Sequence, residues 1–136
     1  MVRIDVVYEG DLHTRCEHGP SGAVLGTDAP VDNQGRGESY SPTDLAATAL
    51  ASCMLTVMGI VAKQHGWKLE GSTGRVEKDM VAQPLRRIGR LGVHLAMAPG
   101  VPVEARSVLE RTAHTCPVRQ SLHPDIEVDV EFDWPA

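Results

Sequence analysis

The sequence is poor in aromatic residues, and it lacks the patterns that mark several large classes of protein. Aromatic residues make up 4% of the chain, so its core must be built mainly from aliphatic side chains and methionine. The formal net charge of -5 provides no cationic surface for nucleic acid or an anionic membrane. No glycine-rich nucleotide motif and no Cys-x-x-Cys or His-x-x-x-His spacing occurs. We therefore expect no nucleic-acid partner, no membrane, no cofactor and no metal.

Cysteines are also few, and their spacing is not that of a disulfide framework. The three cysteines, Cys16, Cys53 and Cys116, are an odd number at wide separation. The first ten residues, MVRIDVVYEG, lack the cationic start, apolar stretch and cleavage site of a secretory signal. These features predict a cytoplasmic protein with reduced thiols.

One uncharged segment, residues 45–62, has the length of a membrane span. Small or weakly polar residues (Ala, Thr, Ser, Cys and Gly) supply about half of it, and no second span or aromatic belt accompanies it. We instead expect a helix that is apolar on all sides because it is buried on all sides.

Length and composition predict one α+β domain over residues 1–136. Alternating patterns predict strands at 2–8, 12–17, 23–27, 67–76, 85–97 and 126–132. Helices are predicted from Pro42 to about His65, over 102–114, and from Pro117 to Leu122. The irregular segment 28–40 is predicted to be a loop long enough to carry function.

The clearest helix start in the chain lies at Ser41. This residue is a typical N-cap, Pro42 occupies the first helical position, and Asp44 stands three residues after the cap, which approximates a capping box. We therefore expect the long apolar helix to begin here.

The cysteines have competing interpretations. Cys53 lies midway along the apolar helix, where a buried cysteine can simply be a small hydrophobic residue. Cys116 precedes Pro117 at a predicted helix N-terminus, where free N–H groups favour a thiolate, although it can also be an unreactive cap. We interpret Cys16, in a predicted strand, as an incidental thiol.

Taken together, the segments SPTDLAATALASC and HTCPVRQSL resemble the OsmC/Ohr family of peroxide-reducing proteins. The resemblance covers nearly the whole chain and matches the two family cysteines to Cys53 and Cys116. It implies an OsmC-like fold, in which an antiparallel β-sheet wraps around a long buried central helix. It also implies an intertwined homodimer with active sites at the interface between the subunits.

The resemblance further implies a peroxidase of oxidative-stress defence that needs no cofactor. The Cys53 thiolate would attack a hydroperoxide and become a sulfenic acid, and Cys116 would then form a disulfide with it. An external dithiol would reduce that disulfide by exchange. In the organic-hydroperoxide members this reductant is a lipoylated protein.

A buried thiolate needs a nearby cation. The family supplies an Arg, for which Arg36 is the candidate here and Arg15 the alternative, although Arg36 can also be a solvated loop residue. The family's orienting Glu corresponds to Thr43 in this sequence. Asp44 and Glu38 are the neighbouring carboxylates, and Glu38 could orient Arg36 instead.

Thr43 and His114 each allow two interpretations. The threonine at position 43 motivates an alternative function, a non-enzymatic binder that holds a hydrophobic small molecule in the pocket of the dimer interface. His114 lies two residues before Cys116 and could polarise a thiol. At the end of a helix, however, a cationic side chain also interacts favourably with the helix dipole, which is a purely structural role.

Overall fold

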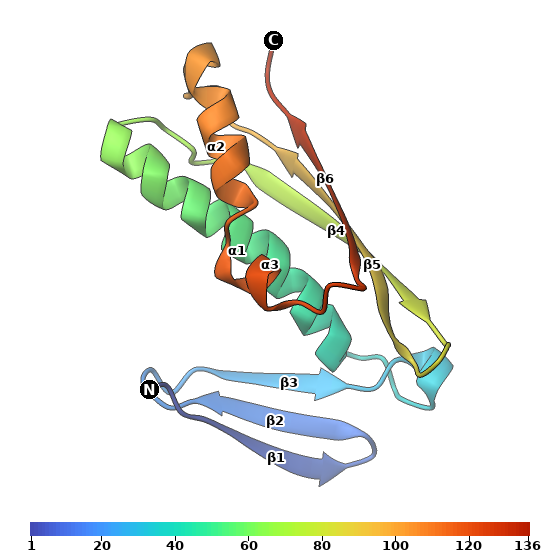
Figure 1. Cartoon of the computed structure of the whole chain (residues 1–136). Coiled ribbons are helices and arrows are strands. Elements are labelled where there is room, and N and C mark those ends of the chain that lie inside the picture. The colour runs from blue at the N-terminus through green and yellow to red at the C-terminus, as the bar shows by residue number, and fades with distance from the viewer. The chain divides into compact units, whose positions relative to one another are not determined.

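The computed structural model describes residues 1–136, which divide into two compact units, Met1–Ala46 and Ala47–Ala136. Each unit contains one three-stranded sheet, and the two sheets with their helices make an α+β fold (Figure 1). The first sheet contains β1 (Ile4–Gly10), β2 (His13–His18) and β3 (Val24–Asp28). The second contains β4 (Thr73–Val81), β5 (Arg87–Ala96) and β6 (Glu127–Asp133).

The first sheet is an antiparallel meander in the order β1-β2-β3. Asp11 and Leu12 connect β1 to β2 and both have positive φ, as a tight hairpin turn requires. The register between the strands shifts between Tyr8 and Gly10, so Glu9 is an extra residue in β1. Such a bulge redirects the side chain it carries.

The two ends of the loop after β3 are joined by a backbone hydrogen bond. The N–H of Asp28 donates to the carbonyl of Tyr40 at 3.0 Å, which closes the loop at its base. A short 3-10 helix, η1 (Val31–Asn33), lies within it. The predicted loop is thus confirmed over residues 29–40, whereas Asp28 belongs to β3. Backbone hydrogen bonds make this loop compact.

The long helix α1 (Pro42–His65) has defined signals at both ends. The N–H of Ser41 donates to Asp44 Oδ2 at 2.9 Å and the N–H of Asp44 donates to Ser41 Oγ at 3.1 Å, which confirms the capping box. At the other end Gly66 has a φ of 73°, and the N–H groups of Gly66 and Trp67 donate back to Lys63 and Ala62. This Schellman motif ends the helix.

The segment after α1 corrects one predicted strand. The structure begins β4 at Thr73 rather than at Trp67. Trp67 instead stacks on the ring of His65, with ring centroids 4.3 Å apart. The alternation at 67–69 reflects a single β-bridge between Lys68 and Gly100.

The second sheet is mixed, and this corrects the expectation of a purely antiparallel sheet. β4 pairs antiparallel with β5, whereas β5 pairs parallel with β6. A parallel pair needs a crossover connection, which the helical segment between β5 and β6 supplies. That segment contains η2 (Val103–Ala105), α2 (Arg106–Ala113) and α3 (Pro117–Ser121), so the helix predicted at 102–114 is divided in two.

Helix α1 packs against this second sheet along one stripe. A Cβ on Gly74 would contact the side chains of Leu95, Leu55 and Ala51, so β4 and the helix approach closely there. The buried residues of the helix recur at helical spacing: Ala47, Leu50, Ala51, Met54, Met58 and Ala62.

The prediction of a helix buried on all sides is wrong within the chain. Only 33% of its most apolar stretch is buried, and Ile60 is 54% exposed. By length and composition α1 could cross a membrane, but core helices of soluble proteins pass the same test. Its buried stripe against the sheet is that of a core helix.

Candidate functional site

Two of the three cysteines come together in the second unit. Cys53 lies midway along α1, and Cys116 is the N-cap residue of α3. The thiol of Cys53 lies within hydrogen-bonding reach of Cys116. The crossover after β5 therefore returns the chain to the middle of α1 and places two distant thiols side by side.

Cys116 is fully buried, and its surroundings favour the neutral thiol. Burial is the main cause that raises the pKa of Cys116; the N–H of Arg119 lowers it, and the nearby Cys53 raises it again. That N–H donates to the sulfur at 3.3 Å. The N-cap position expected for Cys116 is confirmed. Of its two interpretations, burial favours the neutral capping thiol over a thiolate, because its effect on the pKa exceeds that of the amide groups of a five-residue helix.

Cys16 and Arg15 lie on β2, in the first unit. The half-buried sulfur of Cys16 is 3.8 Å from Thr14 Oγ1. Arg15 Nη1 is 3.1 Å from Glu17 Oε2, and each of these two side chains is 44% exposed. Arg15 is thus engaged in a surface ion pair of the kind that contributes about 0.2–1 kcal/mol.

Arg36 stands between two glycines that the shape of the loop requires. A Cβ on Gly35 would overlap the carbonyl group of Ala29. Gly37 has a φ of 63° and donates its N–H to that carbonyl at 3.2 Å. The sequence Gly-Arg-Gly therefore holds the backbone of Arg36 in one place within the first unit.

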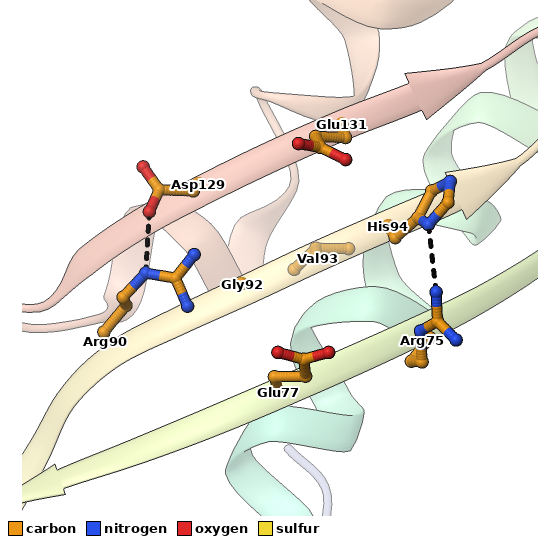
Figure 2. A pocket seen from close by; sticks show the side chains of 8 residues that line it. All are labelled: Arg75, Glu77, Arg90, Gly92, Val93, His94, Asp129 and Glu131. Atoms are coloured by element: carbon orange, nitrogen blue, oxygen red, sulfur yellow. Dashed lines mark hydrogen bonds and ion pairs between the residues drawn. The ribbon is translucent and has the colours of Figure 1, made fainter.

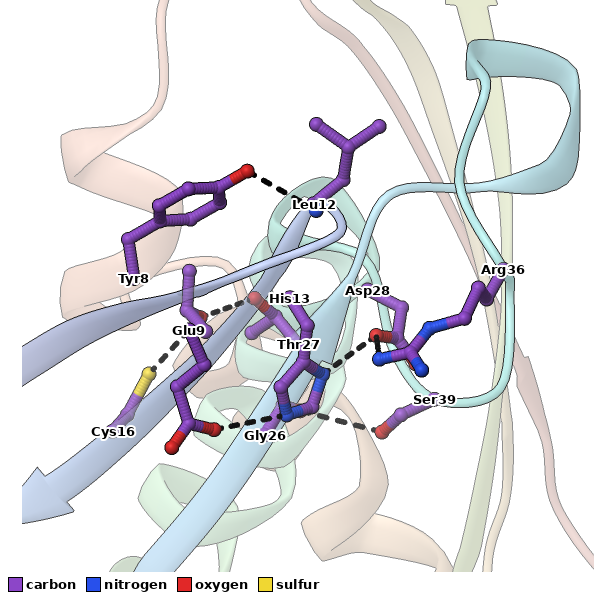
Figure 3. Close-up of polar contacts among 11 residues, drawn as sticks. Tyr8, Glu9, Leu12, His13, Cys16, Gly26, Thr27, Asp28, Arg36 and Ser39 are labelled. Carbon is purple, nitrogen blue, oxygen red and sulfur yellow. Dashed lines mark hydrogen bonds and ion pairs between the residues drawn. The ribbon is translucent and has the colours of Figure 1, made fainter.

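The guanidinium of Arg36 faces the buried carboxylate of Asp28 at the end of β3. Arg36 Nη2 is 3.9 Å from Asp28 Oδ1 (Figure 3). The same oxygen lies 2.6 Å from His13 Nδ1, and the other ring nitrogen of His13 is 3.4 Å from Glu9 Oε1. Three strands and the loop thus contribute to one polar cluster: Glu9, His13, Asp28 and Arg36.

The helix start positions the other predicted support residues. Asp44 is engaged in the capping box with Ser41, and Thr43 Oγ1 is 3.2 Å from Ser41 Oγ. Glu38 is exposed in the loop. The carboxylate within ion-pair distance of Arg36 is therefore that of Asp28.

Sequence reasoning missed Asp28 and His13. It placed Asp28 as the first residue of a loop, whereas the structure pairs it in register with His13 across β2 and β3. An acidic residue at the end of an alternating strand, opposite a histidine in the preceding strand, was the signal available. To use this signal, one must know which residues of β2 and β3 are paired, and the alternating pattern alone does not fix that register.

His114 follows the last turn of α2 as its C-cap. Its exposed ring meets Phe132 edge-on, with centroids 6.0 Å apart. This placement suits the structural interpretation of His114. No group of three or more His, Cys, Asp or Glu side chains in residues 1–136 is arranged to hold a metal ion.

A shallow groove of about 190 Å³ lies over the charged face of the second sheet (Figure 2). Two pairs of its polar side chains are hydrogen-bonded. Arg90 Nε donates to Asp129 Oδ2 at 2.8 Å, and Arg75 Nη2 is 3.3 Å from His94 Nδ1. A second hollow of about 420 Å³ lies beside the C-terminal end of α1. Neither Cys53 nor Cys116 lines these two hollows.

Known proteins share this fold. The family model described as OsmC-like protein matches residues 35–131. A solved structure from Psychrobacter arcticus, named for osmotic stress and a detoxification response, has 44% identity and a TM-score of 0.91, covering 97% of this chain and 96% of its own. No match was found among curated proteins.

More distant solved structures share the fold alone. The organic hydroperoxide resistance protein OsmC of Legionella pneumophila is 18% identical, with a TM-score of 0.78 over 98% of this chain and 96% of its own. The organic hydroperoxide resistance protein OhrB of Bacillus subtilis is 16% identical, with a TM-score of 0.69 over 98% of each chain.

Proposed function

Because the chain belongs to the OsmC-like protein family, we propose that it is a thiol-dependent reductase of organic hydroperoxides that acts in oxidative-stress defence. The observation that carries this proposal is the contact between Cys53 and Cys116 in the second unit. A thiol peroxidase with an internal resolving cysteine needs two such sulfurs, and they must meet without large movement of the backbone.

The proposed reaction has three steps. The Cys53 thiolate attacks the distal oxygen of the hydroperoxide, the O–O bond breaks, and the leaving alkoxide takes a proton to become an alcohol. The thiol of Cys116 then displaces water from the Cys53 sulfenic acid and forms a disulfide. An external dithiol reduces this disulfide by exchange and is itself oxidised to a disulfide. We expect a lipoylated protein in this last role.

The surroundings of Cys116 support this division of labour. Two thiols in contact do not both ionise readily, because like charges at close range repel. Burial raises the pKa of Cys116 and keeps its proton in place. In the proposed mechanism Cys53 therefore carries the negative charge and attacks, and Cys116 follows as the resolving thiol.

The thiolate requires a cation, and we assign this role to Arg36 rather than to Arg15. Arg15 is engaged by Glu17 on the sheet surface. Arg36 lies in a loop whose glycines hold its backbone, and its side chain is 48% exposed, so several of its N–H donors are free to bind a thiolate and a hydroperoxide.

We also propose that the protein is an obligate homodimer in which the sheets wrap around the central helices. Six apolar residues of the first sheet are 47% to 63% exposed: Ile4, Val6, Val7, Tyr8, Val24 and Leu25. Neighbouring strand residues point to opposite faces, so Val6 and Val7 leave both faces of this sheet uncovered. Apolar exposure of this extent is typical of an interface between subunits. We also propose a cytoplasmic location.

The test is a thiol count after exposure of the reduced protein to cumene hydroperoxide. The wild type should lose the Cys53 and Cys116 thiols and keep that of Cys16. Cys53→Ser should lose none, whereas Cys116→Ser should lose one and leave a sulfenic acid that dimedone traps. Cys16→Ser is the matched control and should behave as the wild type.

A different outcome would support the alternative function, a non-enzymatic binder of a hydrophobic small molecule. If Cys53 and Cys116 both stay reduced, and an apolar ligand is retained through gentle purification in the wild type and in Cys53→Ala alike, the protein is a binder and not a peroxidase.

A further inference from the structure

The carboxylate of Asp28 is buried, and buried charges are retained only where partners hold them. Its side chain is 3% exposed, although it belongs to the last residue of a strand. We propose that Asp28 is a positioning residue for Arg36, and that His13 and Glu9 hold Asp28 in place. This inference rests on the proposed function, in which Arg36 stabilises the reactive thiolate.

The contact between Asp28 and Arg36 is built into the first unit from both sides. On the backbone side, the N–H of Asp28 donates to Tyr40 and closes the loop that carries Arg36. On the side-chain side, Oδ1 of Asp28 lies 3.9 Å from Arg36 Nη2. The same residue thus anchors the base of the loop and attracts its only arginine.

His13 holds the Asp28 carboxylate in a defined orientation. Its Nδ1 lies 2.6 Å from Asp28 Oδ1, and because a carboxylate only accepts hydrogen bonds, this ring nitrogen carries a proton and donates it. The opposite nitrogen of the ring is 3.4 Å from Glu9 Oε1 (Figure 3). A ring held at both nitrogens cannot rotate without losing a partner.

The hairpin explains why Glu9 reaches this ring. Glu9 is the extra residue of the bulge in β1, and a bulge turns a side chain away from the direction that regular alternation would give it. His13 and Asp28 are direct partners across β2 and β3. The order Glu9, His13, Asp28, Arg36 therefore follows the sheet from β1 to the loop.

This arrangement gives Arg36 a carboxylate that does not come from the helix start. A guanidinium presents its donors in a rigid planar fork, so fixing one edge also directs the other. Asp28 approaches one Nη of Arg36, and about half of the side chain stays exposed. The exposed donors can then face a thiolate or a hydroperoxide oxygen with little loss of conformational freedom.

The test is a double-mutant cycle read out on Cys53 alone. In a Cys16→Ser/Cys116→Ser background, we compare Asp28→Asn, Arg36→Met and the double variant with Asp11→Asn as the matched control. Asp11 is an exposed turn residue with positive φ, a conformation that asparagine tolerates. Two rates are measured against pH: alkylation of Cys53 by iodoacetamide, and its oxidation by cumene hydroperoxide.

We expect Arg36→Met to slow both reactions near neutral pH about tenfold and to move the midpoint of the alkylation profile to higher pH. Asp28→Asn should produce the same kind of change, roughly fivefold. The double variant should be no slower than Arg36→Met, because Asp28 acts only through Arg36. Asp11→Asn should match the background protein.

Three results would overturn the inference. Additive effects in the double variant would mean that Asp28 acts independently of Arg36, and an Asp28→Asn protein with an unchanged profile would mean that it does not act at all. An unchanged profile in Arg36→Met would remove the residue through which Asp28 is said to act. If Asp28→Asn does not fold by circular dichroism, Asp28→Glu replaces it and must show the same non-additivity.

Failure of the proposed function would be visible separately. The alkylation profile reports the ionisation of Cys53 without any peroxide. A protein that follows the expected alkylation cycle but is not oxidised by hydroperoxide keeps the role of Asp28 and loses the peroxidase. If hydroperoxide oxidises Cys53 but the effects of Asp28→Asn and Arg36→Met on alkylation are additive, the peroxidase proposal stands and the role of Asp28 does not.

Discussion

Cys116 shows how its surroundings decide what one residue can do. Its position before Pro117 favours a thiolate if the helix terminus alone is considered. The side chain is nevertheless fully buried, and the loss of hydration disfavours its charge more than one N–H bond from Arg119 favours it. In the proposed reaction Cys116 gives up this proton when its sulfur attacks the sulfenic acid, and the proton leaves with the hydroxyl group as water.

The raised pKa of Cys116 can be measured directly. The test uses the Cys16→Ser/Cys53→Ser variant, in which Cys116 is still buried. Unfolded in urea, this variant should show an alkylation midpoint near the ordinary thiol pKa of about 8.5. The folded variant should show a midpoint at higher pH. Since the folded state keeps this proton to higher pH, the free energy of unfolding should fall as pH rises from the ordinary value to the raised one. Identical midpoints would contradict the effect of burial.

At the scale of elements, α1 and the second sheet depend on each other for burial. Leu95 of β5 is completely buried and lies where β4 and α1 approach each other at Gly74. The alternation along β5 buries every second residue from Leu91 to Leu95 against the helix side, and the charged residues face the other way. The sheet would expose this apolar face without the helix.

Leu95→Ala should therefore lower the free energy of unfolding by roughly 2–5 kcal/mol, through lost contacts and a residual cavity. The matched control is Leu85→Ala, because Leu85 is 76% exposed in the loop between β4 and β5. This control should change stability by less than about 0.5 kcal/mol. Urea unfolding at one fixed protein concentration measures both, and equal losses would show that the packing does not depend on Leu95.

At the scale of the whole molecule, the chain leaves many apolar side chains exposed. The first sheet has exposed apolar side chains on both faces, and α1 has the exposed Ile60 opposite its buried stripe. A second copy of the chain is the partner that the family resemblance implies. Burial between two copies would cover these exposed apolar side chains.

Light scattering should therefore give twice the chain mass of 14.7 kDa at micromolar concentration. The midpoint of unfolding should also rise with protein concentration, because dimer formation and folding are linked. A stable species of 14.7 kDa with a concentration-independent midpoint would exclude the obligate dimer.

Local patterns in the sequence determined the element order, the capping of α1 at Ser41, and the N-cap of α3 at Cys116, because each depends on residues only a few positions apart. Only the tertiary structure decided the contact of Cys53 with Cys116, the parallel pairing of β5 with β6, and the meeting of Asp28 with Arg36. These depend on strand register and on a crossover between distant segments. Burial, which sets the charge of Cys116, exists only once those segments have packed.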